Sequence, residues 1–288
     1  MVARLNGMAL GGGLELALSC DSIVASAKAV LAFPETGIGI YPGLGGTQRT
    51  SRRIGKALTK WLVYTGQFLD AVTAEKIGLI DWAGPYAGLD RAVLQAIDQG
   101  KRALERRGPA RSRQAVLGAI GSDPMMAGLV GLFERVSIAA VMAEAGTVGS
   151  VGPGATGPSA TGAGPARSGP AGAGPARSGP AGAGPVRPGT PATGSANGGT
   201  SSGRGANGGP AGKEAAAVAA AEKILGKIRT KAPIALRLSE ELIEKGGDAA
   251  LDDGLAMEMA HMEEIFRSED AIEGLSSVGR KQPAFRGR

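Results

Sequence analysis

Two glutamates draw attention because each lies beside apolar residues, where a carboxylate needs either a task or a partner. Glu15 lies within the apolar run Leu14–Leu18, and Glu35 directly follows Pro34 at the end of another apolar run. Two carboxylates that share a site can divide the work of general acid and general base. The alternative for Glu15 is a carboxylate that caps a helix start, and for Glu35 it is a solvated loop position.

Three consecutive glycines, Gly11 to Gly13, precede the run that contains Glu15. Backbone N–H groups at a helix start lack partners within the helix, and glycine leaves them accessible. Such groups can stabilise negative charge that develops on an oxygen during a reaction. A tight turn between a strand and a helix is the alternative interpretation of the same three residues.

The chain has one cysteine, Cys20, and one histidine, His261. A single cysteine excludes an internal disulfide and a cysteine-rich zinc site. A single histidine argues against most histidine-based metal sites and against a histidine-activated nucleophile. We therefore expect no metal site, a core position for Cys20 and a structural role for His261.

The elements that must position these residues alternate between strands and helices. The predicted strands are 2–5, 23–25 and 30–33, and the predicted helices are 14–20 and 47–65. A glycine-rich loop at 42–46 precedes the second helix. Alternation at this spacing is typical of a layered α/β architecture.

The predicted helix 47–65 carries basic and apolar side chains on opposite sides. The basic residues are Arg49, Arg52, Arg53, Lys56 and Lys60, and the apolar residues include Leu58, Trp61 and Leu62. We interpret the basic side as a solvated face, with phosphate binding as the alternative.

The rest of the chain divides into a low-complexity segment and further helices. Residues 146–212 hold 22 Gly and 10 Pro among 67 residues, and they contain no Asp, Glu or Lys. Such a segment buries too little apolar surface to offset its ordering entropy, so we predict disorder. The further predicted helices are 89–107, 125–145, 214–230, 233–245, 251–267 and 268–275.

We therefore divide the chain into a core region at 1–145, a disordered insert at 146–212 and a C-terminal helical region at 213–288. The arginines of the insert supply most of the net charge of +6; they are Arg167, Arg177, Arg187 and Arg204. The insert has no aromatic residue for base stacking, so it does not favour nucleic-acid binding. No apolar run is long enough to predict a membrane span, and no signal-peptide pattern is present, so we expect a cytoplasmic protein.

Taken in order, the motifs resemble those of the enoyl-CoA hydratase/isomerase (crotonase) superfamily. The motifs are NGMALGGGLELALSCDSIVAS, FPETGIGIYPGLGGTQRTSRRIGKAL and TGQFLDAVTAEKIGLID, with KAPIALRLSEELIEKG and EDAIEGLSSVGRKQPAF near the end. They cover about residues 1–83 and 222–288. The resemblance implies an α/β crotonase-like (ClpP/crotonase) spiral fold of ββα units with a C-terminal helical region.

The resemblance also implies catalytic roles. Gly12, in the GGG motif, matches an oxyanion-hole donor whose N–H holds the thioester oxygen of the substrate. Glu15 and Glu35, 20 residues apart as in the family, match the two catalytic glutamates of the hydratases. There the pair holds one water: the residue at Glu15 takes its proton as it attacks the β-carbon, and the residue at Glu35 protonates the α-carbon.

Further substrate-binding residues follow from the same resemblance. Gly43, in YPGLGG, matches a glycine near the reacting end of the substrate. Phe266 matches a position beside the CoA or acyl group, with a core phenylalanine as the alternative. Arg280 and Lys281 match cations near the CoA phosphates, with a solvated basic tail as the alternative. The implied substrate is an acyl-CoA thioester, no cofactor is expected because CoA is part of the substrate, and the implied assembly is a homo-oligomer, either a trimer or a hexamer.

The chain departs from the family pattern in two places. Family domains carry further sequence before the NGxALGGG motif, including a second oxyanion donor, so we expect a fold that is incomplete at the N-terminus. We expect weak or no hydration from this chain alone, because losing one oxyanion donor costs on the order of 10²–10³ in rate. The insert is the second departure. The wording of the motifs also resembles the hydratase part of fused 3-hydroxyacyl-CoA dehydrogenase/enoyl-CoA hydratase proteins.

The function that the resemblance implies is a lyase reaction of the fatty-acid β-oxidation type. Water adds in the syn sense to a 2-enoyl-CoA thioester and gives a 3-hydroxyacyl-CoA. Two alternatives stay open: an enoyl-CoA isomerase of the same family, and a non-catalytic remnant that acts as a subunit.

Overall fold

The computed structural model describes residues 1–100, 108–148 and 210–288, which belong to one compact unit. Side chains are described for all of these except 145–148 and 210–214. Residues 149–209, with Arg167, Arg177, Arg187 and Arg204, lie outside the described residues, so the predicted disorder of the insert stays a prediction. The two ends of the insert, 146–148 and 210–212, lie in helices α7 (Ile138–Val148) and α8 (Pro210–Arg229).

In the described part of the chain, short strands form two three-stranded sheets. The first sheet is parallel and has the order β1 (Val2–Leu5), β3 (Ser22–Ser26), β6 (Trp82–Gly84). The second has the order β2 (Met8–Leu10), β4 (Val30–Ala32), β5 (Leu69–Asp70). In it β2 and β4 are parallel, and β4 and β5 are antiparallel. The mixed α/β content predicted from the sequence is confirmed.

The pairing of β2 with β4 determines where the two glutamates lie. These strands run parallel in a register that places Leu10 opposite Ala32, so both strands end at the same edge of the sheet. Beyond that edge, β2 leads through Gly11 into helix α1 (Gly12–Leu18), which carries Glu15. Beyond the same edge, β4 leads into the 3₁₀ helix η1 (Glu35–Ile38), which Glu35 begins. The fold therefore brings two residues 20 positions apart to one place.

Helix α2 (Gly46–Thr65) is the most buried long helix of the core. Leu58, Leu62 and Tyr64 are almost completely excluded from solvent, and they pack with residues of both sheets and of α6 (Pro124–Phe133). α2 bends at Gly55, whose positive φ of 76° interrupts the helical conformation. The apolar side predicted for this helix is therefore confirmed as a core face.

The basic side of α2 is not the solvated face that we predict from the sequence. Arg52, Arg53 and Lys60 are buried, with 6%, 3% and 5% exposure. The guanidinium of Arg52 donates to the carbonyl oxygens of Gln48, Gly246 and Ala249. That of Arg53 donates to the carbonyl oxygen of Leu79 and forms an ion pair with Asp81. Buried guanidinium groups are tolerated here because each charge keeps hydrogen-bond acceptors in place of water.

The remaining helices surround this core, and several predicted helices are divided in the structure. They are α3 (Ala71–Lys76), η2 (Tyr86–Gly88), α4 (Leu89–Asp98), α5 (Arg113–Ile120), α9 (Pro233–Glu241), the π-helical turn η4 (Leu242–Gly246), α10 (Leu251–Ala260), α11 (Met262–Arg267) and α12 (Glu269–Ser277). The predicted helix 125–145 is divided into α6 and α7, and 251–267 is divided into α10 and α11 at His261. Helix α5 is absent from the sequence prediction, and Cys20 is buried as expected.

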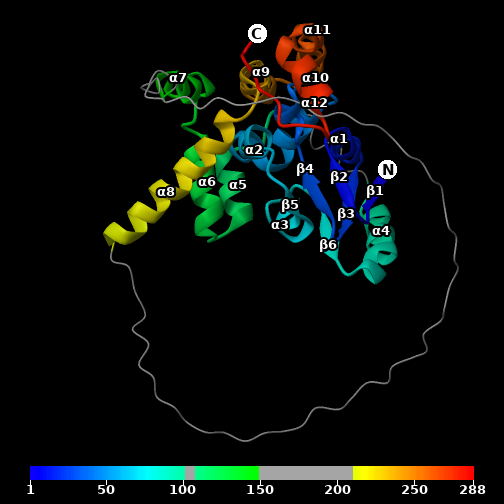
Figure 1. Ribbon diagram of the computed structural model, residues 1–288. Coiled ribbons are helices and arrows are strands. Elements are labelled where there is room, and N and C mark those ends of the chain that lie inside the picture. Colours follow the sequence, from blue (N-terminus) through cyan, green and yellow to red (C-terminus); the bar gives the residue numbers. More distant parts are fainter. Residues whose placement is uncertain (101–107, 149–209) are drawn as a thin grey trace, which may run out of the picture. The chain divides into compact units, whose positions relative to one another are not determined.

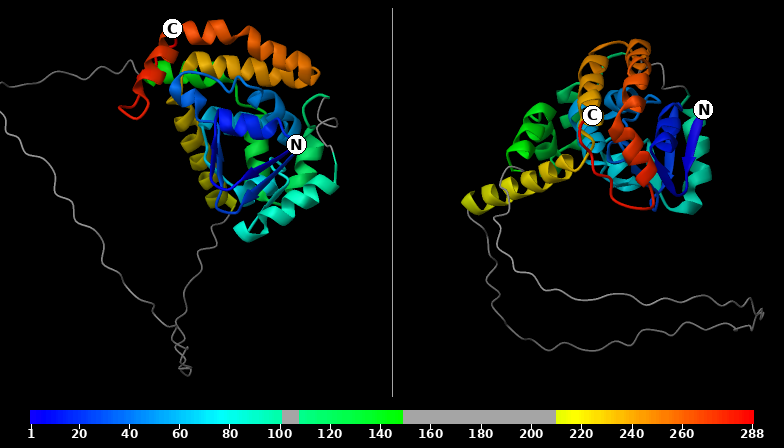
Figure 2. Two further views of the ribbon diagram at one scale, coloured as in Figure 1. Left: turned by 90° about the vertical axis from the view of Figure 1, so that its right-hand side faces the viewer. Right: turned by 45° about the horizontal axis from the view of Figure 1, so that its top comes forward.

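The C-terminal helices α9 to α12 pack against the elements around the two glutamates rather than forming a separate layer. Figures 1 and 2 show α9 to α12 (orange to red) beside α2 and the turn that precedes it (blue). α12 contacts η1, and α10, η4 and α9 contact α2. No single described helix is long and apolar enough to cross a membrane; α6 with Ile138–Glu144 of α7 meets the length and composition criteria as a pair bent by 85°.

Candidate active site

Glu15 is a buried carboxylate that binds the backbone of another segment. Its helix α1 is LELAL over residues 14–18, which places Leu14, Ala17 and Leu18 in the core and Glu15 with them, at 3% exposure. Glu15 Oε1 accepts hydrogen bonds from the N–H groups of Leu44, at 2.7 Å, and Gly46, at 2.8 Å. Gly46 is the first residue of α2, so Glu15 does cap a helix start, but that of α2 and not of its own helix.

The environment of Glu15 acts on its ionisation in two directions. Burial raises the pKa of Glu15 above its usual value, because desolvation disfavours the charged form. The hydrogen bonds from Leu44 and Gly46, together with the positive charge of Arg49, lower the pKa and oppose that effect. The ionised form of this carboxylate is therefore supported by two backbone donors on one oxygen atom.

Glu35 is also buried, at 6% exposure, which makes the solvated loop position considered from the sequence wrong. Its Oε2 atom has no hydrogen-bond partner among the residues that the structure describes. Burial, together with the nearby charge of Glu15, raises the pKa of Glu35 to about 8, against the lowering effect of its own backbone N–H. At neutral pH the carboxyl group of Glu35 is therefore mostly protonated, which is the state that a proton donor requires.

Gly11 permits this close approach of Glu35 to the turn before α1. Its φ of 53° lies in the left-handed region, and a Cβ atom at this position would lie 2.6 Å from Glu35 Oε1. Gly11 also donates its N–H to the carbonyl oxygen of Ala32, at 2.9 Å, which joins the turn to the end of β4. The glycine cluster therefore forms the tight strand-to-helix turn that was one of its two interpretations.

The next glycine, Gly12, presents the start of α1 to solvent. Gly12 is the first residue of the helix and is exposed, so its N–H has no partner within the helix. A Cβ atom on Gly12 would meet only the Leu44 Cδ1 atom, at 3.6 Å. Gly12 therefore lies near the Leu44 side chain, and the role of its N–H as an oxyanion donor stays a prediction.

The other residues expected to bind substrate come from three different segments. Gly43 is buried in the loop that holds Glu15, and a Cβ atom there would lie 2.6 Å from Met262 Cε. Phe266, on α11, is 51% exposed, so the core alternative for this side chain is wrong. Arg280 and Lys281 follow α12 and are exposed, and Lys281 forms an ion pair with Glu273 at 2.8 Å. No described hydrogen bond or ion pair joins Phe266, Arg280 or Lys281 to either glutamate.

One buried acid at this site was not singled out from the sequence. Glu258, on α10, is 1% exposed and accepts hydrogen bonds from the N–H groups of Gly45 and Thr47. Burial and the nearby charge of Glu15 raise the pKa of Glu258 to about 7, against the lowering effect of the Thr47 hydroxyl. The signal that identified Glu15, a carboxylate within an apolar helical run, is also present around Glu258 in LDDGLAMEMA.

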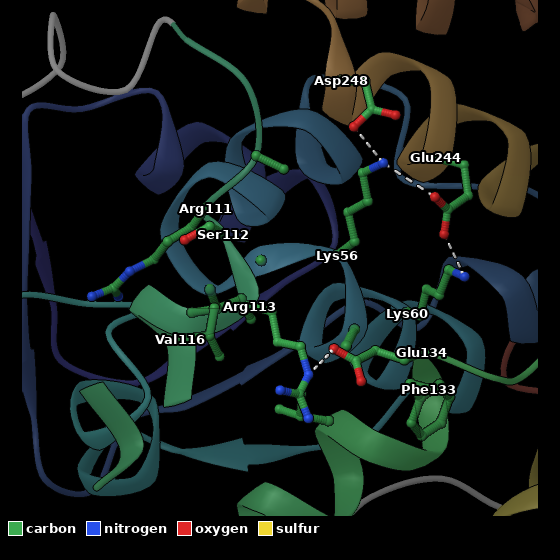
Figure 3. A pocket seen from close by; sticks show the side chains of 15 residues that line it. Lys56, Lys60, Arg111, Ser112, Arg113, Val116, Phe133, Glu134, Glu244 and Asp248 are labelled. Carbon is green, nitrogen blue, oxygen red and sulfur yellow. Dashed lines mark hydrogen bonds and ion pairs between the residues drawn. The ribbon is translucent and has the colours of Figure 1, made fainter. Parts of the chain in front are cut away.

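A cavity of about 360 Å³ lies elsewhere, and neither Glu15 nor Glu35 lines it (Figure 3). It opens between α2, α5, α6 and η4. Most of its charged groups pair with one another: Lys56 with Glu244 and Asp248, Lys60 with Glu244, and Arg113 with Glu134. Arg111, which also lines the cavity, donates to the backbone carbonyl oxygen of Arg53. We give more weight to the carboxylate pair than to this cavity, because most of its cations are already paired. Within the described residues no cluster of three or more His, Cys, Asp or Glu could hold a metal ion.

Comparison with known families and proteins finds similarity over part of the chain. A family described as "Enoyl-CoA hydratase/isomerase" matches residues 1–114. The chain is 44% identical over 115 residues to "Putative enoyl-CoA hydratase/isomerase YngF" of Bacillus subtilis, which covers 40% of this chain and 43% of that protein. It is 53% identical over 81 residues to "Short-chain-enoyl-CoA hydratase" of Clostridioides difficile, which covers 28% of this chain and 52% of that protein.

Residues 1–114 therefore carry a domain of the enoyl-CoA hydratase/isomerase (crotonase) superfamily. The chain matches about half or less of the length of these relatives. A crystal structure of a carnitinyl-CoA dehydratase from Mycobacterium thermoresistibile resembles the fold with a TM-score of 0.56 at 18% identity, over 99% of this chain and 62% of that one. An enoyl-CoA hydratase from Rhodobacter sphaeroides gives the same TM-score of 0.56, so the fold is crotonase-like. Some relatives are named as mitochondrial proteins.

Proposed function

We propose that this chain contributes a hydratase site, in which Glu15 and Glu35 add water to a 2-enoyl-CoA thioester in the syn sense. The observation that carries the proposal is the different environment of the two carboxyl groups. Glu15 Oε1 accepts two backbone hydrogen bonds, which support the ionised form, whereas Glu35 Oε2 is buried without a partner among the described residues. Titratable groups whose environments differ in this way are suited to opposite roles as base and acid.

The proposed reaction has two proton transfers, one to Glu15 and one from Glu35. The Glu15 carboxylate takes a proton from a water molecule as the water oxygen forms a bond to the β-carbon. The π electrons of the double bond move toward the α-carbon and the thioester oxygen, and the carboxyl group of Glu35 supplies the proton that the α-carbon gains. Glu15 then holds a proton and Glu35 is ionised, so exchange with solvent restores the starting state. Each transfer contributes about 10²–10⁴ in rate.

The N–H of Gly12, an exposed residue, completes the proposed group of catalytic contacts. As the thioester oxygen gains enolate charge, this N–H donates to it, which lowers the energy of the transition state more than that of the bound substrate. Gly43, Phe266, Arg280 and Lys281 are the proposed contacts for the rest of the acyl-CoA. The reaction needs no separate cofactor, because CoA is part of the substrate, and we propose fatty-acid β-oxidation as the setting, with a trimer or hexamer as the assembly and a cytoplasmic location.

The experiment is hydration of crotonyl-CoA, followed by the loss of thioester-conjugated absorbance and by identification of the product. It is performed with this chain alone and with the chain co-expressed with the N-terminal half of a full-length relative. We expect 3-hydroxybutyryl-CoA as the product, with weak turnover by the chain alone. A product with a shifted double bond would instead assign the isomerase alternative. Absence of turnover in both preparations, with the chain folded, would assign a non-catalytic subunit, and either result contradicts the proposal.

A further inference from the structure

Two buried carboxylates divide the backbone donors of one short segment, residues 44–48, between them. Glu15 accepts from the N–H groups of Leu44 and Gly46. Glu258 accepts from those of the other three residues: Gly45 at 2.6 Å, Thr47 at 3.1 Å and Gln48 at 3.3 Å. The segment therefore lies between α1 and α10, with every one of its N–H groups bonded to one of two carboxylates.

The contacts of Glu258 form a built arrangement rather than a single chance contact. Its Oε1 also accepts from the hydroxyl of Thr47, and the backbone carbonyl of Glu258 accepts from the Tyr41 hydroxyl at 2.6 Å. Gly45, which donates to Glu258 Oε2, has a φ of 98° and is the N-cap of α2. A carboxylate that is 1% exposed is costly to bury unless donors compensate it, and here backbone and hydroxyl donors do so.

We propose that Glu258 is a positioning residue for Glu15: by holding the N–H groups of Gly45, Thr47 and Gln48, it fixes the segment whose other two N–H groups hold Glu15 Oε1. This inference rests on the proposed function for its catalytic meaning, but not for its structural content. No described hydrogen bond joins Glu258 to Glu15, and Glu258 has no place in the proposed proton transfers. It acts through the backbone, from a helix more than 200 residues further along the chain.

The charges around the two carboxylates set the sign of the test. Three groups face Glu258: Glu15 across the segment, Arg52 on α2, and the Tyr41 hydroxyl. Burial lowers the pKa of Arg52, and the negative charge of Glu258 opposes that effect. Glu15 is faced by Arg49, which lowers its pKa, and it is coupled to Glu35. If Glu258 acted on Glu15 only through its charge, removing that charge would lower the pKa of Glu15, because one like charge disappears. Releasing the segment would raise it, because Glu15 would lose backbone donors.

The test compares the pKa of Glu15 in the full chain and in Glu258→Gln, measured by site-resolved NMR titration of the side-chain carboxyl carbon. The amide group of glutamine keeps the shape of the side chain but replaces one acceptor with a donor, so one edge of the segment loses its partner. We expect the pKa of Glu15 to rise in Glu258→Gln. Glu263→Gln is the matched control, because Glu263 is an exposed acid that pairs with Arg267, and there the pKa of Glu15 stays unchanged. A fall or no change in Glu258→Gln overturns the proposal.

A second pair of variants keeps the test decisive if Glu258→Gln does not fold. Thr47→Val removes the hydroxyl donor to Glu258 while keeping the size of the side chain and the backbone N–H. We expect the pKa of Glu15 to rise in Thr47→Val by less than in Glu258→Gln, and to return to the original value in Thr47→Ser, which restores a hydroxyl. An equal pKa in all three forms of residue 47 overturns the proposal.

Kinetics separate this inference from the proposed reaction. In the preparation that hydrates crotonyl-CoA, Glu258→Gln is expected to lower kcat by about tenfold to a hundredfold with little change in KM, since a misplaced base slows the chemical step. An unchanged kcat, or a change confined to KM, counts against a positioning role. The titration needs no turnover, so a raised pKa of Glu15 together with an absence of hydration would support the positioning of Glu15 and reject the proposed reaction.

Discussion

The two ends of the site place the carboxyl group of a glutamate in opposite environments. At the end formed by α1, α10 and the segment 44–48, carboxylates meet backbone N–H groups at every position of the segment. At the end formed by η1 and the turn at Gly11, the Glu35 side chain lies against backbone, and Oε2 has no partner within the described residues. Both glutamates are almost equally buried, at 3% and 6% exposure.

The difference teaches that burial alone does not assign an acid or a base. Desolvation raises the pKa of both glutamates, and for each of them it is the largest cause. What distinguishes them is where the backbone donors come from. Glu15 Oε1 accepts from two N–H groups of another segment, those of Leu44 and Gly46. The backbone group that lowers the pKa of Glu35 is its own N–H, and Glu35 Oε2 has no partner among the described residues. The same type of side chain can therefore be protonated in one environment and ionised in the other, although both glutamates lie beyond one edge of the sheet.

The largest expected effect comes from removing the carboxyl groups themselves. Glu15→Gln and Glu35→Gln should each lower kcat for crotonyl-CoA hydration by about 10²–10⁴, in the preparation that shows turnover, because each removes one proton transfer. Circular dichroism should show that both variants remain folded, and Glu263→Gln should keep full activity. If either variant turns over at the original rate, that glutamate has no part in the mechanism.

The next effect tests the backbone at the Glu35 end through two neighbouring glycines. Gly11→Ala places a side chain at a φ of 53° and within 2.6 Å of Glu35 Oε1, so it should destabilise the chain by about 1–3 kcal/mol. Gly12→Ala is the matched control, because its Cβ meets only Leu44 Cδ1 at 3.6 Å. Urea denaturation measures both. Equal stabilities for the two variants would mean that the turn at Gly11 is not needed to seat Glu35.

A smaller effect is expected in the dependence of stability on pH. The unfolded chain releases the Glu35 proton near 4.5, whereas the folded chain keeps it up to about 8. Between these values the folded state binds more protons, so the unfolding free energy contributed by this group is full below pH 4.5 and is lost as pH rises through 8. The slope for one group cannot exceed about 1.4 kcal/mol per pH unit.

Denaturation of the full chain and of Glu35→Gln at several pH values isolates this contribution. The glutamine variant should gain stability relative to the original chain as pH rises from 5 to 8, because it has no charge to bury. A constant difference across this range would show that Glu35 ionises at its ordinary pKa in the folded chain, and the contrast between the two ends of the site would disappear.

The smallest effect concerns the exposed tail. Lys281→Ala removes an ion pair with Glu273 in which both side chains are partly solvated, so it should change stability very little. If Lys281 contacts the CoA phosphates as proposed, the variant raises KM for crotonyl-CoA without lowering kcat. Thermal denaturation measures the effect on stability, and initial rates at several substrate concentrations measure the effect on KM. A loss of kcat would contradict a role for Lys281 in binding alone.

Local sequence features were sufficient to predict part of this site. Glu15 and Glu35 could be found because each interrupts an apolar run, and the glycines before α1 indicated a turn with accessible N–H groups. The burial of Arg52 could not be predicted, because its carbonyl acceptors Gly246 and Ala249 come from almost 200 residues away in the chain. For Glu258 the carboxylate in an apolar helix was visible, but its partners at 45–48 lie more than 200 residues before it.

The fold shows the same division between local and distant information. Strands β1, β3 and β4 and the helices α1 and α2 follow from short-range patterns of apolar residues, glycine and proline. The breaks between α6 and α7 and at His261 between α10 and α11 were not predicted. α6 packs against α2, whereas α7 packs against α8 and α9, and α10 packs against α2 and η4. These distant partners are absent from a local sequence pattern.

The most direct test of the account is a site-resolved carboxyl titration of Glu15 and Glu35 in the same folded chain. The account predicts that Glu35 titrates near 8 and that Glu15, with its two backbone donors, titrates below it, so that near neutral pH one group is ionised and the other protonated. If Glu35 titrated near 4.5, or if Glu15 held its proton to a higher pH than Glu35, the division into base and acid would be contradicted.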